Sequence, residues 1–463
     1  MITTSDVGSD GWYLNRCWKK LKARQKRIEG LLARFENQAP LPASLQQAPD
    51  AAKRFYRASR TGFAEMIVKA VKYPLRVQGV LTDADQDSAD LGDAIAEKML
   101  ISSNMADEID DVHRLSLVTG DAYAIISMYN DDRPVYTSES PREVVTIHDP
   151  VVQAERLVAA KFTWDSELGH AVAYLYTQSY VRRAVPKRRE WRETGSVAFS
   201  PQAWEWEDPQ DYPESITGTV PVLRYRNEEG VGEFERHDGL LDRLEHMIVQ
   251  GMTIATLQAF KQRAIHVSQE DMPDEDEAGD PIDYDDILSA DPGALWKLPE
   301  TSRVWESGNV DLTPVWTGME KFTQQLSAVT FTPLAMFSPE GQNQSAAGAG
   351  FAREGRTFKI EDRQDRLGRV HAEALALLFA LAGDKERSRR EAVQFIWRPA
   401  ERYSLAEKGD AMTKYRAGGV PWRSRMIDVG QYTPRQVQRM EAERLADELL
   451  FPADVAANQP AEA

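Results

Sequence analysis

The stretch DGLLDRLEHMIVQGM, residues 238–252, decides the fold, because it begins one of two long helices that enclose a segment of different composition. Apolar residues recur at Leu240, Leu244 and Ile248, which is the spacing of one helix face. The pattern predicts a helix over residues 238–265. At 1.5 Å per residue this helix is roughly 40 Å long, which is long for a globular protein.

The segment that follows this helix is acidic. Residues 270–291 contain eleven acidic side chains and no basic one. Residues 294–309 are typical of one or two short strands. A second helix is predicted to begin near Thr313, with Pro314 at its first position, and to end before Pro333. Two helices therefore bracket a compact excursion that is partly β.

Toward the N-terminus the sequence predicts helices first and a sheet second. Helical spacing is present in residues 11–38, 51–71 and 91–118, and the period changes to two near Gly120. Segments rich in β-branched and aromatic residues then indicate strands. These segments are residues 122–130, 144–150, 157–165, 171–177 and 219–227. The predicted fold class is α+β and predominantly helical.

Toward the C-terminus the sequence GQNQSAAGAG, residues 341–350, lacks any large apolar side chain and is expected to form a loop. A long helix is predicted over residues 351–381, and a strand over residues 392–400. Further helices are expected from Ser404 onward. Basic residues recur at three- and four-residue steps along the long helix, and these are Arg353, Arg356, Lys359, Arg363 and Arg366.

Composition limits the classes of function. The chain has 463 residues, and 73 acidic against 56 basic side chains give a net charge of −17. This charge argues against a protein that clamps nucleic acid, but not against a surface that DNA slides past. The single cysteine, Cys17, excludes an internal disulfide and fits a reducing compartment. The longest apolar run, residues 374–382, is about half of the ~20 residues needed to span a bilayer. We therefore expect a soluble, non-exported protein that does not enter a membrane.

Catalytic motifs are missing from the sequence. It contains no G-x-x-x-x-G-K-[ST], no G-x-S-x-G and no H-E-x-x-H. The acidic run fits a calcium loop poorly, because Ala278 and Asp285 stand where oxygen ligands and a bidentate Glu belong. We therefore expect no catalytic residue, no metal and no cofactor. A metal-dependent nuclease that uses acids in the range from about Asp274 to Asp286 remains an alternative.

The order of these segments resembles the portal proteins of long-tailed phages, which form the head-to-tail connector ring. TVPVLRYRNEEG precedes the first long helix, and FTPLAMF precedes the loop of Gly, Ala and Gln. SLAEKGDAMTKYRAGGVPWRS then precedes a charged terminal helix. The likeness covers about residues 51–450. The ordered set carries the resemblance, because no single piece is as specific as a metal motif. Another structural protein of a phage particle remains an alternative.

The resemblance implies a division of the chain into named parts. A wing is expected to contain helices and then a sheet, and two stem helices to enclose a clip. A tunnel loop is expected to lead into the long helix and a strand that returns to the wing, and a helical crown to follow. The parts are residues 1–236 (wing), 237–266 (first stem helix), 267–311 (clip), 312–332 (second stem helix), 333–402 (tunnel loop, long helix and return strand) and 403–463 (crown).

The resemblance also implies function and partners. About a dozen copies are expected to form a ring around double-stranded DNA at one capsid vertex. The expected partners are the large terminase, the major capsid or scaffolding protein, and the head-tail connector. A separate terminase ATPase would move the DNA. The protein is expected in the virion, and in the host cytoplasm during assembly.

Three groups of site residues follow from this assignment. The tunnel loop is expected to contact DNA through Gln342, Asn343, Gln344, Ser345, Ala346, Ala347 and Gly348. The clip is expected to meet the connector or terminase through Asp274, Glu275, Asp276, Glu277, Asp280 and Asp283. The basic face of the long helix either faces DNA or pairs with acids on the adjacent subunit. A plain surface loop and a merely solvated acidic segment remain the alternatives for the first two groups.

Overall fold

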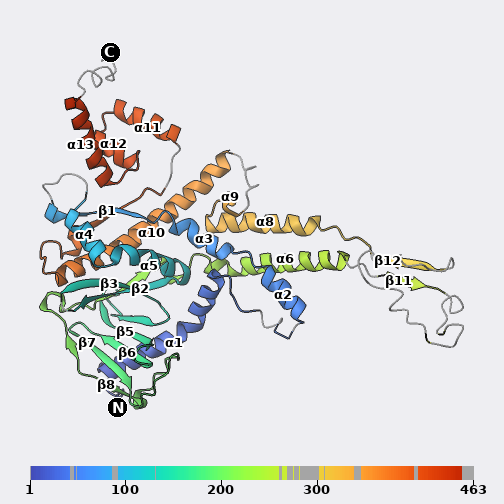
Figure 1. Ribbon diagram of the computed structural model, residues 1–463, viewed down its shortest axis with the longest axis horizontal. Coiled ribbons are helices and arrows are strands. Elements are labelled where there is room, and N and C mark those ends of the chain that lie inside the picture. The colour runs from blue at the N-terminus through green and yellow to red at the C-terminus, as the bar shows by residue number, and fades with distance from the viewer. Residues whose placement is uncertain are drawn as a thin grey trace.

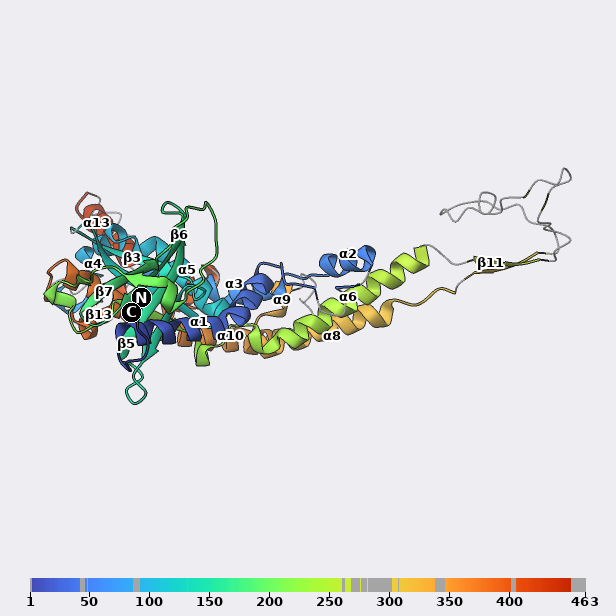
Figure 2. The same ribbon diagram turned by 90° about the horizontal axis from the view of Figure 1, so that it is seen from below.

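The computed structural model shows a body from which a long arm projects (Figures 1 and 2). It describes residues 2–41, 46–47, 49–85, 92–130, 132–259, 263–267, 275, 281, 302–306, 308–337, 346–400 and 405–450. Helices and antiparallel sheets share the body, so the α+β prediction is confirmed. Across the described part of the chain, no helix combines the length and apolarity that a membrane crossing requires.

The first helix, α1 (Asp10–Phe35), connects two hydrophobic cores. Ser9 caps it by accepting a hydrogen bond from the Trp12 amide. Its first half packs Leu14 and Leu21 against the larger sheet. Its second half packs into the main core through Ile28, Leu31, Leu32 and Phe35. The apolar stripe of α1 therefore fixes how the two halves of the body meet.

The next helical region contains four helices where the sequence predicted two. They are α2 (Asp50–Ala58), α3 (Phe63–Lys72), α4 (Ala94–Ser102) and α5 (Met105–Thr119). Gly62 and Asn104 have left-handed backbone angles, with φ of +67° and +65°, and each precedes a new helix. The predicted helices over residues 51–71 and 91–118 are therefore wrong as continuous elements, because periodicity does not register one left-handed residue.

The strands in the described part of the body form three antiparallel sheets. β10 (Val222–Arg226), β2 (Asp121–Tyr129) and β3 (Arg133–Glu139) form one of them in that order. The largest is a meander that α1 covers. Its strands are β4 (Val144–His148), β5 (Arg156–Asp165), β6 (His170–Tyr176), β7 (Tyr180–Pro186), β8 (Trp204–Trp206) and β9 (Gln210–Asp211), the last paired with β7. The five predicted strands are confirmed, although they divide between two sheets rather than one.

The third sheet joins distant parts of the chain. β1 (Val77–Thr82) pairs with β13 (Val393–Trp397), so that Val77 lies opposite Trp397 and Thr82 opposite Val393. The strand predicted near Phe395 is confirmed. Its partner β1 was not predicted, because six residues between helical segments carry little periodic signal.

The described part of the arm contains two antiparallel helices and a pair of antiparallel strands (Figure 1). α6 (Asp238–Ala259) and α8 (Thr313–Thr330) lie side by side, with Gly251 facing Val315 and Trp316. β11 (Arg263–His266) pairs with β12 (Arg303–Glu306) beyond them. The start of α8 at Thr313 is confirmed. The predicted end of the first long helix at residue 265 is wrong, because residues 263–266 pair as a strand.

The long helix α10 (Ala346–Leu381) follows α9 (Leu334–Phe337) and crosses the body. It buries Ile360, Leu367 and Leu378 in the main core. The helices α11 (Leu405–Ala417), α12 (Trp422–Asp428) and α13 (Pro434–Leu450) follow. The described part of the chain also contains short 3-10 helices. These are η2 (Asp83–Asp85), η3 (Pro201–Ala203), η4 (Glu214–Ile216), η5 (Glu228–Gly230), η6 (Glu235–His237) and η8 (Arg390–Ala392).

Candidate functional site where the arm meets the long helix

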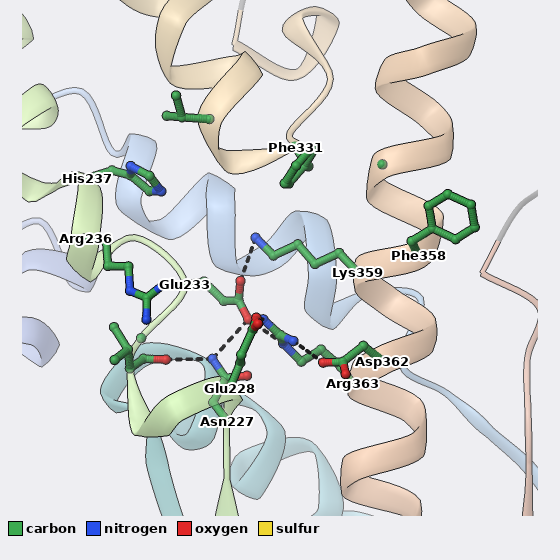
Figure 3. A pocket seen from close by; sticks show the side chains of 14 residues that line it. Asn227, Glu228, Glu233, Arg236, His237, Phe331, Phe358, Lys359, Asp362 and Arg363 are labelled. Carbon is green, nitrogen blue, oxygen red and sulfur yellow. Dashed lines mark hydrogen bonds and ion pairs between the residues drawn. The ribbon is translucent and has the colours of Figure 1, made fainter.

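The start of α6, the end of α8 and the middle of α10 meet around a pocket of about 490 Å³ (Figure 3). The loop between β10 and α6 supplies the polar wall, and α10 supplies the facing cations. The lining residues from the loop are Asn227, Glu228, Val231, Gly232, Glu233, Arg236 and His237. Those from α8 and its end are Val329 and Phe331, and those from α10 are Gly355, Phe358, Lys359, Asp362 and Arg363.

Glu233 is the centre of this site. One carboxylate oxygen lies 2.6 Å from Nζ of Lys359, and the other lies 2.8 Å from Nε of Arg363. Only 2% of the Glu233 side chain and 6% of the Arg363 side chain are exposed. Burial raises the pKa of Glu233, but Lys359 and Arg363 outweigh it and bring the pKa below its ordinary value. The carboxylate is therefore held ionised between two cations.

Hydrogen bonds hold the loop that presents Glu233. The Asn227 side-chain amide donates to the Val231 carbonyl at 2.8 Å and to Glu233 at 3.0 Å. The Glu233 amide donates to the carbonyl of Leu117, at the end of α5, at 2.8 Å. The carboxylate is thus positioned from both the loop and the body before it meets α10.

The same network reaches the arm. Besides binding Glu233, Lys359 donates to the Thr330 carbonyl at 3.1 Å, where α8 ends. A cation at a helix C-terminus satisfies an unpaired carbonyl and favours the helix dipole. The helix α6 begins next to this loop, and the last residue of α8, Thr330, contacts Lys359. Both arm helices are therefore anchored to α10 through one buried charge cluster.

Apolar side chains flank the pocket. Phe331 follows α8 with a left-handed φ of +53°, and its ring lies against Gly355 of α10. A Cβ atom at residue 355 would come within 2.6 Å of this ring, so only glycine fits the present arrangement. Phe331 is 53% exposed and Phe358 is 61% exposed. The Phe358 side chain, although apolar, points away from the core (Figure 3).

The structure gives most of the predicted basic face partners within the chain. Arg356 donates to the Ala70 carbonyl at 3.1 Å, and Arg366 pairs with Asp362 at 2.8 Å. Lys359 and Arg363 belong to the Glu233 network, whereas Arg353 is exposed. Contact of this face with DNA or with a neighbouring subunit stays a prediction.

The predicted tunnel loop falls largely outside the described residues. Gln342, Asn343, Gln344 and Ser345 lie outside them, and Ala346, Ala347 and Gly348 form the first turn of α10. The predicted helix start at residue 351 is therefore wrong by five residues. Alanine favours a helix, so Ala346 and Ala347 extend α10 into a segment that was expected to be a loop because it lacks large apolar side chains.

The predicted clip acids are also outside the described residues, with one exception. Glu275 forms an isolated antiparallel bridge with Pro281. Asp274, Asp276, Glu277, Asp280 and Asp283 lie outside. In the described ranges, no three His, Cys, Asp or Glu side chains gather closely enough to hold a metal ion.

The sequence did not identify Glu233 or Asn227 as site residues. Their segment, NEEGVGEFERH, has no helical or alternating period, and acids beside glycine are typical of surface loops. The cations of α10 were identified, but their partner lies 126 residues before Lys359 in the chain. Both carboxylate oxygens of Glu233 are bound by cations of α10, so the loop before α6 and the end of α8 are held against α10.

Comparisons with known proteins bear on the whole chain. A family model described as "Phage portal protein, SPP1 Gp6-like" matches residues 14–448. No curated protein sequence matches the chain. Among solved structures, a chain of the "Virion of native gene transfer agent (GTA) particle" is similar with a TM-score of 0.45 and 11% identity, covering 88% of this chain and 99% of that one. A chain of the "Neck of native GTA particle computed with C12 symmetry" has a TM-score of 0.43 and 10% identity, with 88% and 99% covered.

Proposed function

This chain belongs to the SPP1 Gp6-like family of phage portal proteins, and we propose that its copies close into a ring whose channel passes double-stranded DNA. The match over residues 14–448 carries this proposal. It includes the body, the arm, the long helix and most of the C-terminal helices. Because the match extends over all these parts, it supports a role for the whole chain and not for one part of it alone.

We propose that the parts of the portal correspond to elements of this structure. α6 and α8 would be the stem, since they project from the body as an antiparallel pair. Residues 267–311 would be the clip and residues 1–236 the wing. Residues 342–348, the last three of which begin α10, would be the tunnel loop, and residues 403–463 the crown.

The charge of the protein supports passage rather than tight binding. With a net charge of −17, the chain has too little positive charge overall to neutralise many phosphates. A ring of such chains would repel DNA on average, and the DNA would slide instead of adhering. We propose that the work of packaging comes from a separate terminase ATPase and that this chain is not an enzyme.

The proposed partners follow the portal role. They are the large terminase during packaging, the major capsid or scaffolding protein during assembly, and the head-tail connector afterwards. The protein would assemble in the host cytoplasm and occupy the portal vertex of the virion. About a dozen copies per ring is the number that the family resemblance implies.

Negative-stain imaging and native mass spectrometry of the purified protein test the proposal. We expect closed rings with a central hole and a mass close to twelve chains. A protein that stays monomeric or dimeric at high concentration would contradict the ring. Rings that cleave DNA in Mg²⁺ would contradict the absence of enzymatic activity.

A further inference from the structure

A second pocket, of about 680 Å³, lies between α1, the turn after β4, β10 and η8. We call it the basic cleft, because six of its lining side chains are cationic and only Asp149 and Glu373 are acidic. The cations are Arg16, Lys20, Arg156, Arg224, Arg226 and Arg390. They come from four separate segments, so no local motif in the sequence marks the site. A concentration of positive charge is unusual in a chain with a net charge of −17.

The charges at the floor of the basic cleft are matched within the chain. Arg156 lies 2.5 Å from Glu373, and Arg224 forms two contacts with Asp121 at 2.8 and 3.0 Å. These pairs fix the guanidinium groups in place. They leave little capacity for a further anion at the floor.

The rim has the surplus of positive charge. Arg16 lies 5.0 Å from the Trp12 ring, and Arg226 donates to the Glu229 carbonyl at 3.3 Å. Lys20 donates to the Thr146 carbonyl at 2.9 Å. Among the described residues, no carboxylate lies within 4.0 Å of any of these three cations. Arg390 is 3.7 Å from Glu373, which Arg156 already holds more closely.

The lowered pKa of His148, which also lines the basic cleft, is consistent with an excess of positive charge there. Burial lowers the pKa of His148, and the nearby Arg224, Arg156 and Lys20 lower it further, although its hydrogen bond to the Gln153 carbonyl acts in the opposite direction. His148 is therefore neutral and adds no positive charge near pH 7. The attraction for an anion comes from the arginine and lysine side chains at the rim.

We propose that the basic cleft receives a carboxylate-bearing surface of the adjacent copy of this chain. A ring needs a heterologous interface, in which one patch of each copy meets a different patch of the next. Each neighbour carries seventeen more acids than bases, so its surface supplies carboxylates to complete the rim. Arginine pairs with carboxylates through two parallel hydrogen bonds, which also fixes orientation. This inference rests on the proposed ring.

The shape of the basic cleft favours protein over DNA as the occupant. Its cations surround a pocket between four elements, and side chains on a loop or helix end enter such a pocket easily. The phosphates of duplex DNA lie on a convex surface and are read best by an open stripe of cations. Asp149 and Glu373 also line the pocket and would repel phosphates.

Charge reversal tests the proposal. The triple variant R16E/R226E/R390E changes rim residues and leaves the floor pairs intact. The matched control R54E/R57E/K98E changes net charge equally at exposed residues of α2 and α4, for which the described structure shows no ion pair. The concentration at half-assembly, measured by mass photometry, should rise at least about tenfold for the cleft variant, because like charges then face each other. For the control it should stay within about twofold.

The outcomes separate the basic cleft from the ring itself. If the wild type forms no rings, the proposed function fails. If the wild type forms rings and the cleft variant assembles equally well, or if both variants lose assembly equally, the cleft proposal fails. A cleft variant that assembles normally but loses binding of a short duplex DNA would identify the cleft as a DNA site instead. Circular dichroism and thermal melting of both variants confirm that each chain is folded.

Discussion

His113 on α5 and His371 on α10 lie with their Nε2 atoms 2.9 Å apart in the core of the body. A chain of hydrogen bonds continues from His371 to Tyr225 and from Tyr225 to Tyr136, each at 3.0 Å. All four side chains are buried. This polar chain ties α10 to α5, β10 and β3. It adds a directional constraint to the apolar packing of the long helix.

The histidine pair predicts sensitivity to acid. Burial lowers the pKa of His113 to about 3 and that of His371 well below its ordinary value of 6.5. Both groups are neutral when folded and gain protons when unfolded, so their stabilisation is complete above pH 6.5 and is lost as the pH falls toward 3. By pH 5 each histidine should cost about 2 kcal/mol of the free energy of unfolding. Urea denaturation at pH 7 and pH 5 measures this loss.

Two variants separate this effect from other titrating groups. The double variant H113L/H371L should be less stable at pH 7 but should lose much less stability between pH 7 and pH 5. The variant H246Q changes an exposed histidine of α6 and should keep the wild-type loss. Equal losses in the wild type and the double variant would show that the pair does not cause the acid sensitivity.

Removal of the Glu233 carboxylate should strongly destabilise the protein. The variant E233A leaves Lys359 buried without a counter-charge and leaves Arg363 with only the more exposed Glu228 and Asp362, which costs about 3–5 kcal/mol. The control E228A removes a carboxylate that also binds Arg363 but has 55% of its side chain exposed, so its cost should be about 1 kcal/mol or less. Chemical denaturation measures both. Similar costs for the two variants would contradict the central position of Glu233.

The contact between Gly355 and Phe331 predicts that G355A destabilises the wild type but stabilises a variant that lacks the Phe331 ring. In the wild type, G355A should destabilise, because overpacking against the Phe331 ring costs about 1–3 kcal/mol. In an F331A background the ring is gone, and G355A should stabilise by up to about 1 kcal/mol through its higher helix propensity. A double-mutant cycle in urea measures the coupling. The same sign in both backgrounds would show that α8 and α10 do not meet through this pair.

Bulky residues at the start of α10 should block DNA but not assembly. We expect A346W or A347W to form normal rings and to reduce the amount of DNA packaged per particle. The larger side chains would narrow the DNA channel at the proposed tunnel loop. The control V7W introduces the same side chain at an exposed residue near the N-terminus and should package normally. The amount of DNA that particles protect from nuclease treatment measures the effect. Normal filling in both α10 variants would contradict the tunnel-loop assignment.

Apolar spacing and composition predicted the elements that pack into a hydrophobic core. α1 buries one stripe of apolar residues at helical spacing, which the sequence shows directly. The five strands were indicated by their β-branched and aromatic composition, since β2 and β4 are buried on both faces. The breaks at Gly62 and Asn104 were missed, because one left-handed residue leaves the apolar spacing on either side unchanged. β1 was missed because its register depends on β13 rather than on its own neighbours.

The candidate site was predictable only in part. The cations of α10 follow a regular step and were identified from sequence, since one helix places them on neighbouring turns. Glu233 and the basic cleft depend on segments that only the tertiary fold brings together. The residue counts gave the negative net charge of the chain. They did not show the local excess of positive charge at Arg16, Arg226 and Arg390.

The pairing of β1 with β13 has a consequence for synthesis. Val77 cannot meet Trp397 until some three hundred further residues have left the ribosome, and the whole arm is among them. Contacts of such long sequence separation form late, since loop closure must precede them. We therefore expect the sheet of β1 and β13 to close late, after the arm and α10 have been made. A chain would then become competent for the proposed assembly only after translation has passed β13.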